Sequence, residues 1–247
     1  MALVDIRGLS VDTRLQEIFL TLEAGEMLGV IGPNGAGKST LLAALAGNAA
    51  FTGSIEFDGQ ALNAISLRER ACKIGFLPQS CETAWALSVA DVVSLGRLPW
   101  EDEARDTGLA AVAAAMTATG IEAFATRKVE ALSGGERARV WLARVLAGCP
   151  RLLLADEPVA SLDLFYQHDV MSTLRRHAGA GQAVMLAIHD FVLAERYCDK
   201  LCLLQNGRIY AAGHPAEVLT EANLTAVFRL PMRVDLAAIP PVIAPVF

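Results

Sequence analysis

The sequence has few aromatic residues and no long apolar run, and its first ten residues lack the pattern of a signal peptide. Aromatic residues make up 6% of the 247 residues. The longest uncharged stretch near the middle, residues 107–121, is rich in alanine and threonine, whereas a membrane-spanning helix needs about 20 apolar residues. Asp5 and Arg7 interrupt the first ten residues, so we expect no secretory signal peptide there. A cytosolic chain is the expectation.

The five cysteines are scattered and form no CxxC pair. They are Cys72, Cys81, Cys149, Cys198 and Cys202. This spacing argues against a zinc ribbon or a disulfide framework, and we expect reduced thiols in a reducing compartment. The formal net charge of −6 leaves no basic footprint for a phosphate backbone, so we expect no nucleic-acid partner.

Apolar residues are plentiful, at 53% of the chain, and their pattern predicts the fold class. Residues 3–10 alternate apolar and polar side chains, as a half-buried strand does, and residues 18–22 predict a second strand. Continuous apolar runs at 27–31, 152–155, 183–188 and 200–204 are typical of strands buried on both faces. Helical sequence separates these runs, which indicates an α/β protein with a mostly parallel sheet and additional strands at its N-terminus.

The helical composition of residues 88–147 interrupts the series of strands. We therefore expect a single domain over 1–247, with a core lobe at about 1–81 and 150–230. A helical lobe at about 82–149 would be inserted into it. The tail, about 231–247, contains four prolines after Arg229 and is expected to form an extended, packed appendage.

A glycine-rich loop follows the first buried run and matches the P-loop pattern GxxxxGK[ST]. It consists of Gly32, Pro33, Asn34, Gly35, Ala36, Gly37, Lys38, Ser39 and Thr40, followed by an apolar helical stretch at 39–46. The backbone N–H groups of such a loop surround phosphate oxygens at the positive end of the next helix. We expect Lys38 to reach the β- and γ-phosphates and the Ser39 hydroxyl to bind Mg²⁺. A chance glycine turn would not require this order of strand, loop and helix.

Two adjacent carboxylates, Asp156 and Glu157, end the apolar run at 152–155. A parallel strand that ends there places both at the carboxyl edge of the sheet, beside the phosphate loop. We expect Asp156 to hold Mg²⁺ through water and Glu157 to polarise the attacking water as general base. Without a P-loop the same pattern would usually mark a strand that ends at the surface.

A third motif, Leu132-Ser133-Gly134-Gly135-Glu136, resembles the signature sequence of ABC ATPases. Together with the P-loop and the two carboxylates, it makes the chain similar to that family over nearly its whole length. The resemblance implies a RecA-like P-loop NTPase core that binds and hydrolyses ATP with Mg²⁺. Glutamine is commoner at the position of Glu136, where glutamate is a familiar variant.

The signature motif also implies a partner. A Ser-Gly-Gly helix start can bind a γ-phosphate through its hydroxyl and amides. In the family, Ser133, Gly134, Gly135 and Glu136 would contact the nucleotide held by the opposite subunit. The resemblance therefore implies a head-to-tail homodimer with two shared sites.

Three further residues take roles from the resemblance. Gln79 matches the Q-loop residue that contacts Mg²⁺ and water and links the sheet to the helical lobe. His189 matches the switch histidine that contacts the γ-phosphate and orders Glu157. Asp163, in the run at 161–163, matches the D-loop that lines the dimer seam. Each would be an ordinary surface or strand-end residue without the other motifs.

One position departs from the family pattern. Family members usually carry an aromatic residue upstream of the P-loop that stacks on adenine, and residues 10–15 contain none. Base contacts would then be weaker, or made by aliphatic groups or by Arg14. The affinity would come mainly from phosphates and Mg²⁺, with loose discrimination between ATP and GTP.

The stretch at 87–100, with Gly96-Arg97-Leu98-Pro99-Trp100, resembles ATPases of importers for metal chelates. The resemblance places ferric siderophore first as the cargo, then vitamin B12 or haem. It implies integral membrane permease subunits that dock near 79–100, and indirectly a solute-binding protein. The chain would then lie at the cytoplasmic face of the membrane as a peripheral subunit.

Two alternatives stay open. The first is the ATPase of another ABC transporter, for export or lipid transport. The second is an ABC ATPase outside transport, in DNA repair, chromosome structure or translation. Sustained heptads and a second P-loop, which many proteins of that second kind carry, are absent here, and the negative charge points the same way.

Overall fold

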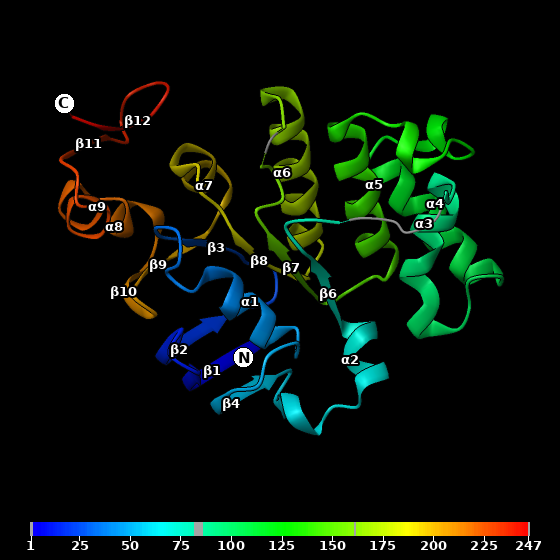
Figure 1. The fold of residues 1–247 in the computed structure, drawn as a ribbon, viewed down its shortest axis with the longest axis horizontal. Helices are drawn as coiled ribbons and strands as arrows, with labels where there is room; N and C mark the ends of the chain where they lie inside the picture. The colour runs from blue at the N-terminus through cyan, green and yellow to red at the C-terminus, as the bar shows by residue number, and fades with distance from the viewer. Residues whose placement is uncertain (1, 82–85, 161, 247) are drawn as a thin grey trace.

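The strands form two main sheets in the computed structural model, which describes residues 2–81, 86–160 and 162–246 (Figure 1). The smaller sheet is antiparallel, with the order β2-β1-β4-β5. Its strands are β1 (Val4–Val11), β2 (Leu15–Leu22), β4 (Thr52–Phe57) and β5 (Gln60–Ala61). The larger sheet has the order β10-β9-β3-β8-β7-β6. Its strands are β3 (Met27–Ile31), β6 (Ile74–Leu77), β7 (Leu152–Asp156), β8 (Ala183–Ala187), β9 (Lys200–Gln205) and β10 (Arg208–Gly213).

The larger sheet is parallel from β6 to β9, and only β10 runs antiparallel to its neighbour. Every residue of β3, β7 and β8 is buried, which is why these strands are continuous apolar runs rather than alternating ones. The predicted fold class is confirmed: an α/β protein with a mostly parallel sheet and antiparallel strands at its N-terminus.

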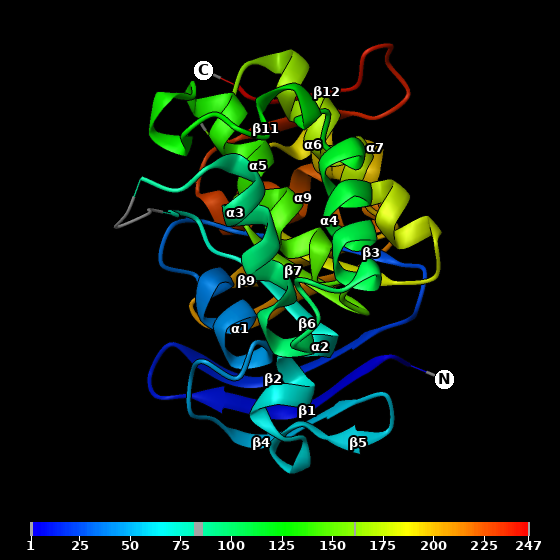
Figure 2. The ribbon, with the colours of Figure 1, turned by 90° about the vertical axis from the view of Figure 1, so that its right-hand side faces the viewer.

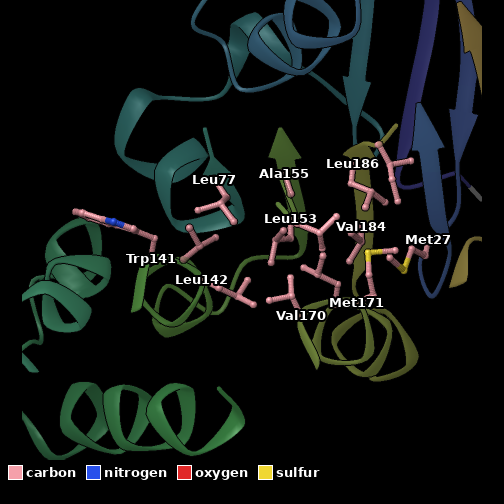
Figure 3. Close-up of a cluster of buried hydrophobic side chains, with 14 of the residues drawn as sticks. Met27, Leu77, Trp141, Leu142, Leu153, Ala155, Val170, Met171, Val184 and Leu186 are labelled. Carbon is pink, nitrogen blue, oxygen red and sulfur yellow. The ribbon is translucent and has the colours of Figure 1, made fainter. Parts of the chain in front are cut away.

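Two hydrophobic cores cover the two faces of the larger sheet. Successive residues of a strand alternate between them, so Leu153 and Ala155 face one core while Leu152 and Leu154 face the other. Figure 3 shows the first core, where Trp141, Leu142, Val170 and Met171 from two helices meet strand residues such as Leu153 and Val184. The second core lies between the two sheets and includes helix α1 (Lys38–Leu45).

The remaining helices fall into two groups in space. One group surrounds the larger sheet and comprises α2 (Leu67–Lys73), α6 (Leu164–Gly179), α7 (Phe191–Tyr197), α8 (Pro215–Val218) and α9 (Glu221–Phe228). The other group packs together at one end of the molecule, at the right of Figure 1 and facing the viewer in Figure 2. Its members are α3 (Val89–Ser94), α4 (Asp106–Ala118) and α5 (Gly134–Ala147), with the 3₁₀ turns η2 (Leu95–Trp100), η3 (Glu122–Phe124) and η4 (Val129–Ala131). A further turn, η1 (Leu62–Ala64), precedes α2.

The tail after Pro231 is a two-stranded antiparallel hairpin of β11 (Met232–Asp235) and β12 (Val242–Pro245). Val234 and Ile243 pack against the first core, whereas Ile239 at the hairpin tip is 99% exposed. Among the described residues, no helix combines the length and the apolar character that crossing a membrane would take.

Candidate functional site

The P-loop lies between β3 and α1, where the sequence places it (Figure 1). Gly37 caps the start of α1 with φ +107°, in the left-handed region that favours glycine. A Cβ on Gly37 would lie 2.6 Å from Leu15 Cδ2 and 3.0 Å from the Arg14 carbonyl oxygen. The loop therefore needs glycine here for its conformation and because the β1–β2 hairpin lies directly against it.

Lys38 is folded back onto its own loop. Its Nζ donates hydrogen bonds to the carbonyl oxygens of Gly32 (2.9 Å) and Pro33 (3.2 Å), and the residue is 5% exposed. Burial lowers the pKa of the Lys38 ammonium, while the carboxylates of Glu157 and Asp156 oppose that shift. The ammonium is thus a buried positive charge held by two carbonyl groups of the P-loop.

Asp156 ends β7 and is 7% exposed. Its Oδ1 is a buried carboxylate oxygen with no hydrogen-bond partner among the described residues. Burial raises the pKa of Asp156, a hydrogen bond with Ser39 opposes the shift, and the neighbouring Glu157 carboxylate adds to it. An unpartnered buried oxygen beside a serine hydroxyl fits a divalent cation of the Mg²⁺ type, which takes few protein ligands and completes its shell with phosphates and water.

Glu157, Gln79 and His189 meet because their strands are neighbours. In the register of the sheet, Leu77 of β6 lies beside Ala155 of β7, and Asp156 lies beside Ala187 of β8. The residues that follow these strand ends therefore converge at one edge of the sheet.

The Glu157 carboxylate is held at both oxygens. Gln79 Nε2 donates to Glu157 Oε2 at 2.8 Å, and His189 Nε2 lies 2.6 Å from Glu157 Oε1. Glu157 has φ +51°, a conformation that non-glycine residues rarely adopt and that often marks functional sites. A carboxylate oriented in this way can accept a proton from a water molecule that is hydrogen-bonded to it.

These residues share one cavity of about 780 Å³. It is lined by Arg14, Asn34, Gly35, Gly37, Lys38, Ser39, Thr40, Gln79, Glu157 and His189. The residues that the sequence predicts for the phosphates, Mg²⁺ and the general base belong to this lining, except Gly32, Pro33, Ala36 and Asp156.

The signature residues lie elsewhere and do not line this cavity. Ser133 is the N-cap of α5: its Oγ accepts from Glu136 N (3.3 Å), and its own N–H donates to Glu136 Oε2 (2.7 Å). This capping box explains a glutamate here in structural terms. It also lowers the pKa of Glu136, chiefly through the bond from the Ser133 amide. Gly134 and Gly135 form the first turn of α5 behind this cap.

Asp163 is the exposed N-cap residue of α6 and makes no capping hydrogen bond with its side chain. The next two residues, Leu164 and Phe165, are each 75% exposed, which is unusual for large apolar side chains. Ser161, the first residue of the predicted D-loop run, lies outside the described residues.

Comparison with known proteins decides what this arrangement belongs to. The family model described as "ABC transporter" matches residues 15–160, more than half of the chain. This chain belongs to the ABC transporter family. It is an ATP-binding subunit of that family, whose members hydrolyse ATP.

The ABC transporter relatives cover most of the chain. A hemin import ATP-binding protein of Streptomyces coelicolor is 46% identical over 222 residues, which cover 89% of this chain and 79% of the relative. A protein of the same name from Pseudomonas entomophila is 43% identical and covers 94% of this chain and 95% of its own length. An inward-facing metal-chelate type ABC transporter is 27% identical, with a TM-score of 0.85, and covers 100% of this chain and 98% of the matched one.

The sequence locates the P-loop and both carboxylates from their spacing alone. It indicates Arg14 only as one possible base contact, and the structure places that residue in the lining of the cavity. Asn34 and Thr40 line it as parts of the P-loop. What distinguishes Arg14 as a candidate contact for the base is its position at the tip of the β1–β2 hairpin, which lies against the P-loop.

Proposed function

We propose that this chain hydrolyses Mg-ATP at two sites shared by a homodimer and thereby powers import of a metal chelate through membrane permease subunits. The observation that carries the hydrolytic part is the Glu157 carboxylate, held by Gln79 at 2.8 Å and by His189 at 2.6 Å. A glutamate fixed at both oxygens beside a phosphate loop is placed to orient the attacking water.

Each residue of the cavity has one task in this proposal. The amides of the P-loop and Lys38 bind the phosphates, and Lys38 exchanges its two carbonyl partners for phosphate oxygens. Ser39, Asp156 and Gln79 would hold Mg²⁺, which would neutralise phosphate charge when bound. Glu157 takes the proton of the attacking water, and His189 keeps that carboxylate in place.

The shared sites follow from where the signature motif lies. Ser133 and the first turn of α5 present a helix N-terminus that does not reach the P-loop cavity of the same chain. A second copy in the opposite orientation would bring Ser133, Gly134, Gly135 and Glu136 to that γ-phosphate. Exposed Leu164 and Phe165, next to Asp163, support a covered seam on this side.

The permease subunits are proposed to dock on the stretch 79–100. Residues 82–85 of that stretch lie outside the described part of the chain. Within the described part, Leu98 is 55% and Trp100 41% exposed, although both are large apolar side chains. Docking there would connect the helical lobe at about 82–149 with Gln79 and the core lobe at about 1–81 and 150–230, at the cytoplasmic face of the membrane.

Haem is the cargo best supported by the comparisons. Eight curated relatives, 43–46% identical, are all named hemin import ATP-binding proteins. The sequence at 87–100 favours a ferric siderophore as the cargo. The names of the relatives favour haem, which we therefore propose first. An indirect solute-binding protein partner belongs to the same proposal.

Hydrolysis is tested by the turnover of Mg-ATP in wild type, Glu157→Gln and His189→Ala. We expect Glu157→Gln to lose at least about a hundredfold in kcat while it still binds ATP, because a proton acceptor contributes roughly 10²–10⁴-fold. Retention of most of the activity by Glu157→Gln would remove Glu157 as the base.

The cargo is tested in the organism that supplies the chain, with the gene deleted and restored. Uptake of haem, a ferric siderophore and vitamin B12 is measured separately. We expect haem uptake to disappear on deletion and to return with wild type but not with Glu157→Gln. Loss of siderophore or B12 uptake with haem uptake intact would move the cargo while leaving the ATPase proposal standing.

A further inference from the structure

Within the described part of the chain, no phenylalanine, tyrosine or tryptophan lines the ATP cavity. All ten lining residues are polar, charged or glycine. Phe19 is the sole residue of these three types among the first fifty, and it lies on β2 over Gly8, with its Cζ 3.7 Å from where a Gly8 Cβ would be. Among the described residues, a group other than an aromatic ring therefore has to contact the nucleotide base.

The β1–β2 hairpin tip lies directly against the start of α1. Its turn, Asp12 to Arg14, is closed by a hydrogen bond from Arg14 N to Val11 O (2.9 Å). Val11 and Leu15, on either side, are 4% and 0% exposed, which anchors the turn in the second core.

Two glycines clamp the backbone of Arg14. A Cβ on Gly37 of the P-loop would lie 3.0 Å from the Arg14 carbonyl oxygen, and one on Gly207 would lie 2.5 Å from it. The carbonyl is thus packed between the phosphate loop and the β9–β10 turn. The neighbouring Gln16 N–H donates to Gly207 O at 2.8 Å and ties the hairpin to that turn. These contacts hold the backbone of Arg14 beside the phosphate loop.

The Arg14 guanidinium is exposed and, within the described residues, makes no hydrogen bond or ion pair. The other cation in the lining, Lys38, is bonded to two carbonyl groups of its loop. Arg208, on the adjacent hairpin, is held by Gln16 Oε1 at 2.8 Å. Arg14 therefore differs from both, because it lines the cavity and its planar cationic group has no hydrogen-bond or ion-pair partner among the described residues.

We propose that Arg14 is the base-binding residue of this site and lays its guanidinium plane against the face of the purine. A guanidinium stacks on aromatic faces and is more weakly hydrated than an ammonium, so it suits this exposed position. Stacking on a ring face does not read the hydrogen-bonding edge of the base. The site consequently accepts adenine and guanine alike, and most of its affinity comes from the phosphates. The inference rests on ATP binding and is independent of the cargo.

Calorimetric titration of the purified chain with ADP, GDP and pyrophosphate, each with Mg²⁺, separates base contacts from phosphate contacts. We expect the Kd values for ADP and GDP to agree within about threefold. Arg14→Ala should weaken the binding of both nucleotides by about 2- to 5-fold, the range of an exposed cation–π contact, and leave the binding of pyrophosphate unchanged. Arg14→Lys should resemble Arg14→Ala, because it keeps the charge and loses the plane. Arg14→Tyr should bind both nucleotides at least as tightly as wild type.

Arg7→Ala is the matched control, since Arg7 lies on β1 of the same hairpin and pairs with Asp5 away from the cavity. It should leave all three affinities unchanged. An ADP affinity unaffected by Arg14→Ala would overturn the proposal. So would an equal loss for pyrophosphate, which would place Arg14 on the phosphates, or a preference for ADP over GDP above about twentyfold. Far-UV circular dichroism and thermal unfolding of each variant keep misfolding apart from loss of contact.

Discussion

Among single residues, two glycines of the P-loop, Gly35 and Gly37, differ in their steric surroundings. Gly37 has a φ of +107°, and a Cβ added to it would lie 2.6 Å from Leu15 Cδ2 and 3.0 Å from the Arg14 carbonyl oxygen. Gly35, with φ +79°, has no atom within 4 Å of its Cβ position. The two positions look alike in the sequence pattern, and only the hairpin against Gly37 distinguishes them.

Gly37→Ala is expected to destabilise the chain by about 2 kcal/mol and to weaken nucleotide binding, because strain and clash fall on the same residue. Chemical unfolding measures the first effect and ADP titration the second. Gly179→Ala is the control: Gly179 ends α6 with no atom within 4 Å of its Cβ position, so stability should stay equal or rise slightly. Equal stability of Gly37→Ala and wild type would mean that the hairpin moves aside.

Among the elements, η2 is joined to the last residue of α5, Ala147, by the side chain of Arg97. The guanidinium donates to both carboxylate oxygens of Asp102 (2.9 and 2.7 Å) and to the carbonyl of Ala147 (2.9 Å), and it lies 4.8 Å from the Trp100 ring centre. The Asp102 interaction is the main reason that the pKa of Arg97 is raised. Gly96 precedes it because a Cβ there would lie 2.0 Å from the Arg144 carbonyl. The Gly-Arg pair in the importer-like motif thus holds η2 against α5.

Arg97→Lys is expected to lower the midpoint of thermal unfolding by several degrees, because lysine cannot replace a two-pronged, stacked guanidinium. Arg68→Lys is the matched control. Arg68 also holds η2, because its Nε donates to the Pro99 carbonyl at 2.9 Å, and it pairs with Glu101 at 3.0 Å. Both charged side chains are more than half exposed, so the change should be about a degree or less. Similar shifts in the two variants would contradict the role given to Arg97.

Helix α6 contains a histidine that couples stability to pH. Burial lowers the pKa of His177 below its ordinary 6.5, while its Nε2 lies 3.2 Å from the Pro150 carbonyl oxygen. In the unfolded chain His177 therefore becomes protonated near pH 6.5, whereas in the folded chain it becomes protonated only at a lower pH. The contribution to the free energy of unfolding is full above pH 6.5 and is lost as the pH falls below it.

We expect wild type to lose more stability than His177→Gln between pH 7.5 and 5.5. Glutamine retains a hydrogen-bond donor for Pro150 and does not titrate. Urea unfolding of both proteins at the two pH values measures this difference. Parallel losses would show that His177 does not carry the effect.

The elements that sequence predicts best are those buried on both faces. The runs at 27–31, 152–155 and 183–188 match β3, β7 and β8 to within one residue, because every side chain there has to be apolar. The strand predicted at 18–22 begins three residues after the true start of β2 at Leu15, because Glu17, with φ +51°, interrupts the alternation. The edge strand β6 has no counterpart among the predicted strands, because four residues with mixed burial give a weak pattern.

The site is predictable from sequence where a motif is contiguous. Glycine spacing locates the P-loop, and an apolar run followed by two carboxylates locates Asp156 and Glu157. Gln79 and His189 are isolated in the sequence, so family resemblance alone points to them. Their contacts with Glu157 depend on the order β6-β7-β8, which periodicity does not specify.

For the whole molecule, we propose that one chain carries two half-sites that do not meet. Its P-loop cavity includes Lys38 and Glu157, and its signature helix begins at Ser133 outside that cavity. In the proposed homodimer, two chains in opposite orientation would complete both sites. Formation of the closed dimer would therefore require ATP, an intact P-loop to bind it, and an intact signature motif to contact it from the opposite chain.

Size-exclusion chromatography of Glu157→Gln in Mg-ATP tests this claim most directly, with Lys38→Ala and Ser133→Arg added singly in the same background. We predict that Glu157→Gln elutes as a dimer with ATP and as a monomer without it. Both added substitutions should keep the chain monomeric, but Ser133→Arg should still bind ATP with unchanged affinity while Lys38→Ala should not. An ATP-independent monomer for Glu157→Gln, or loss of ATP binding by Ser133→Arg, would contradict the shared-site account.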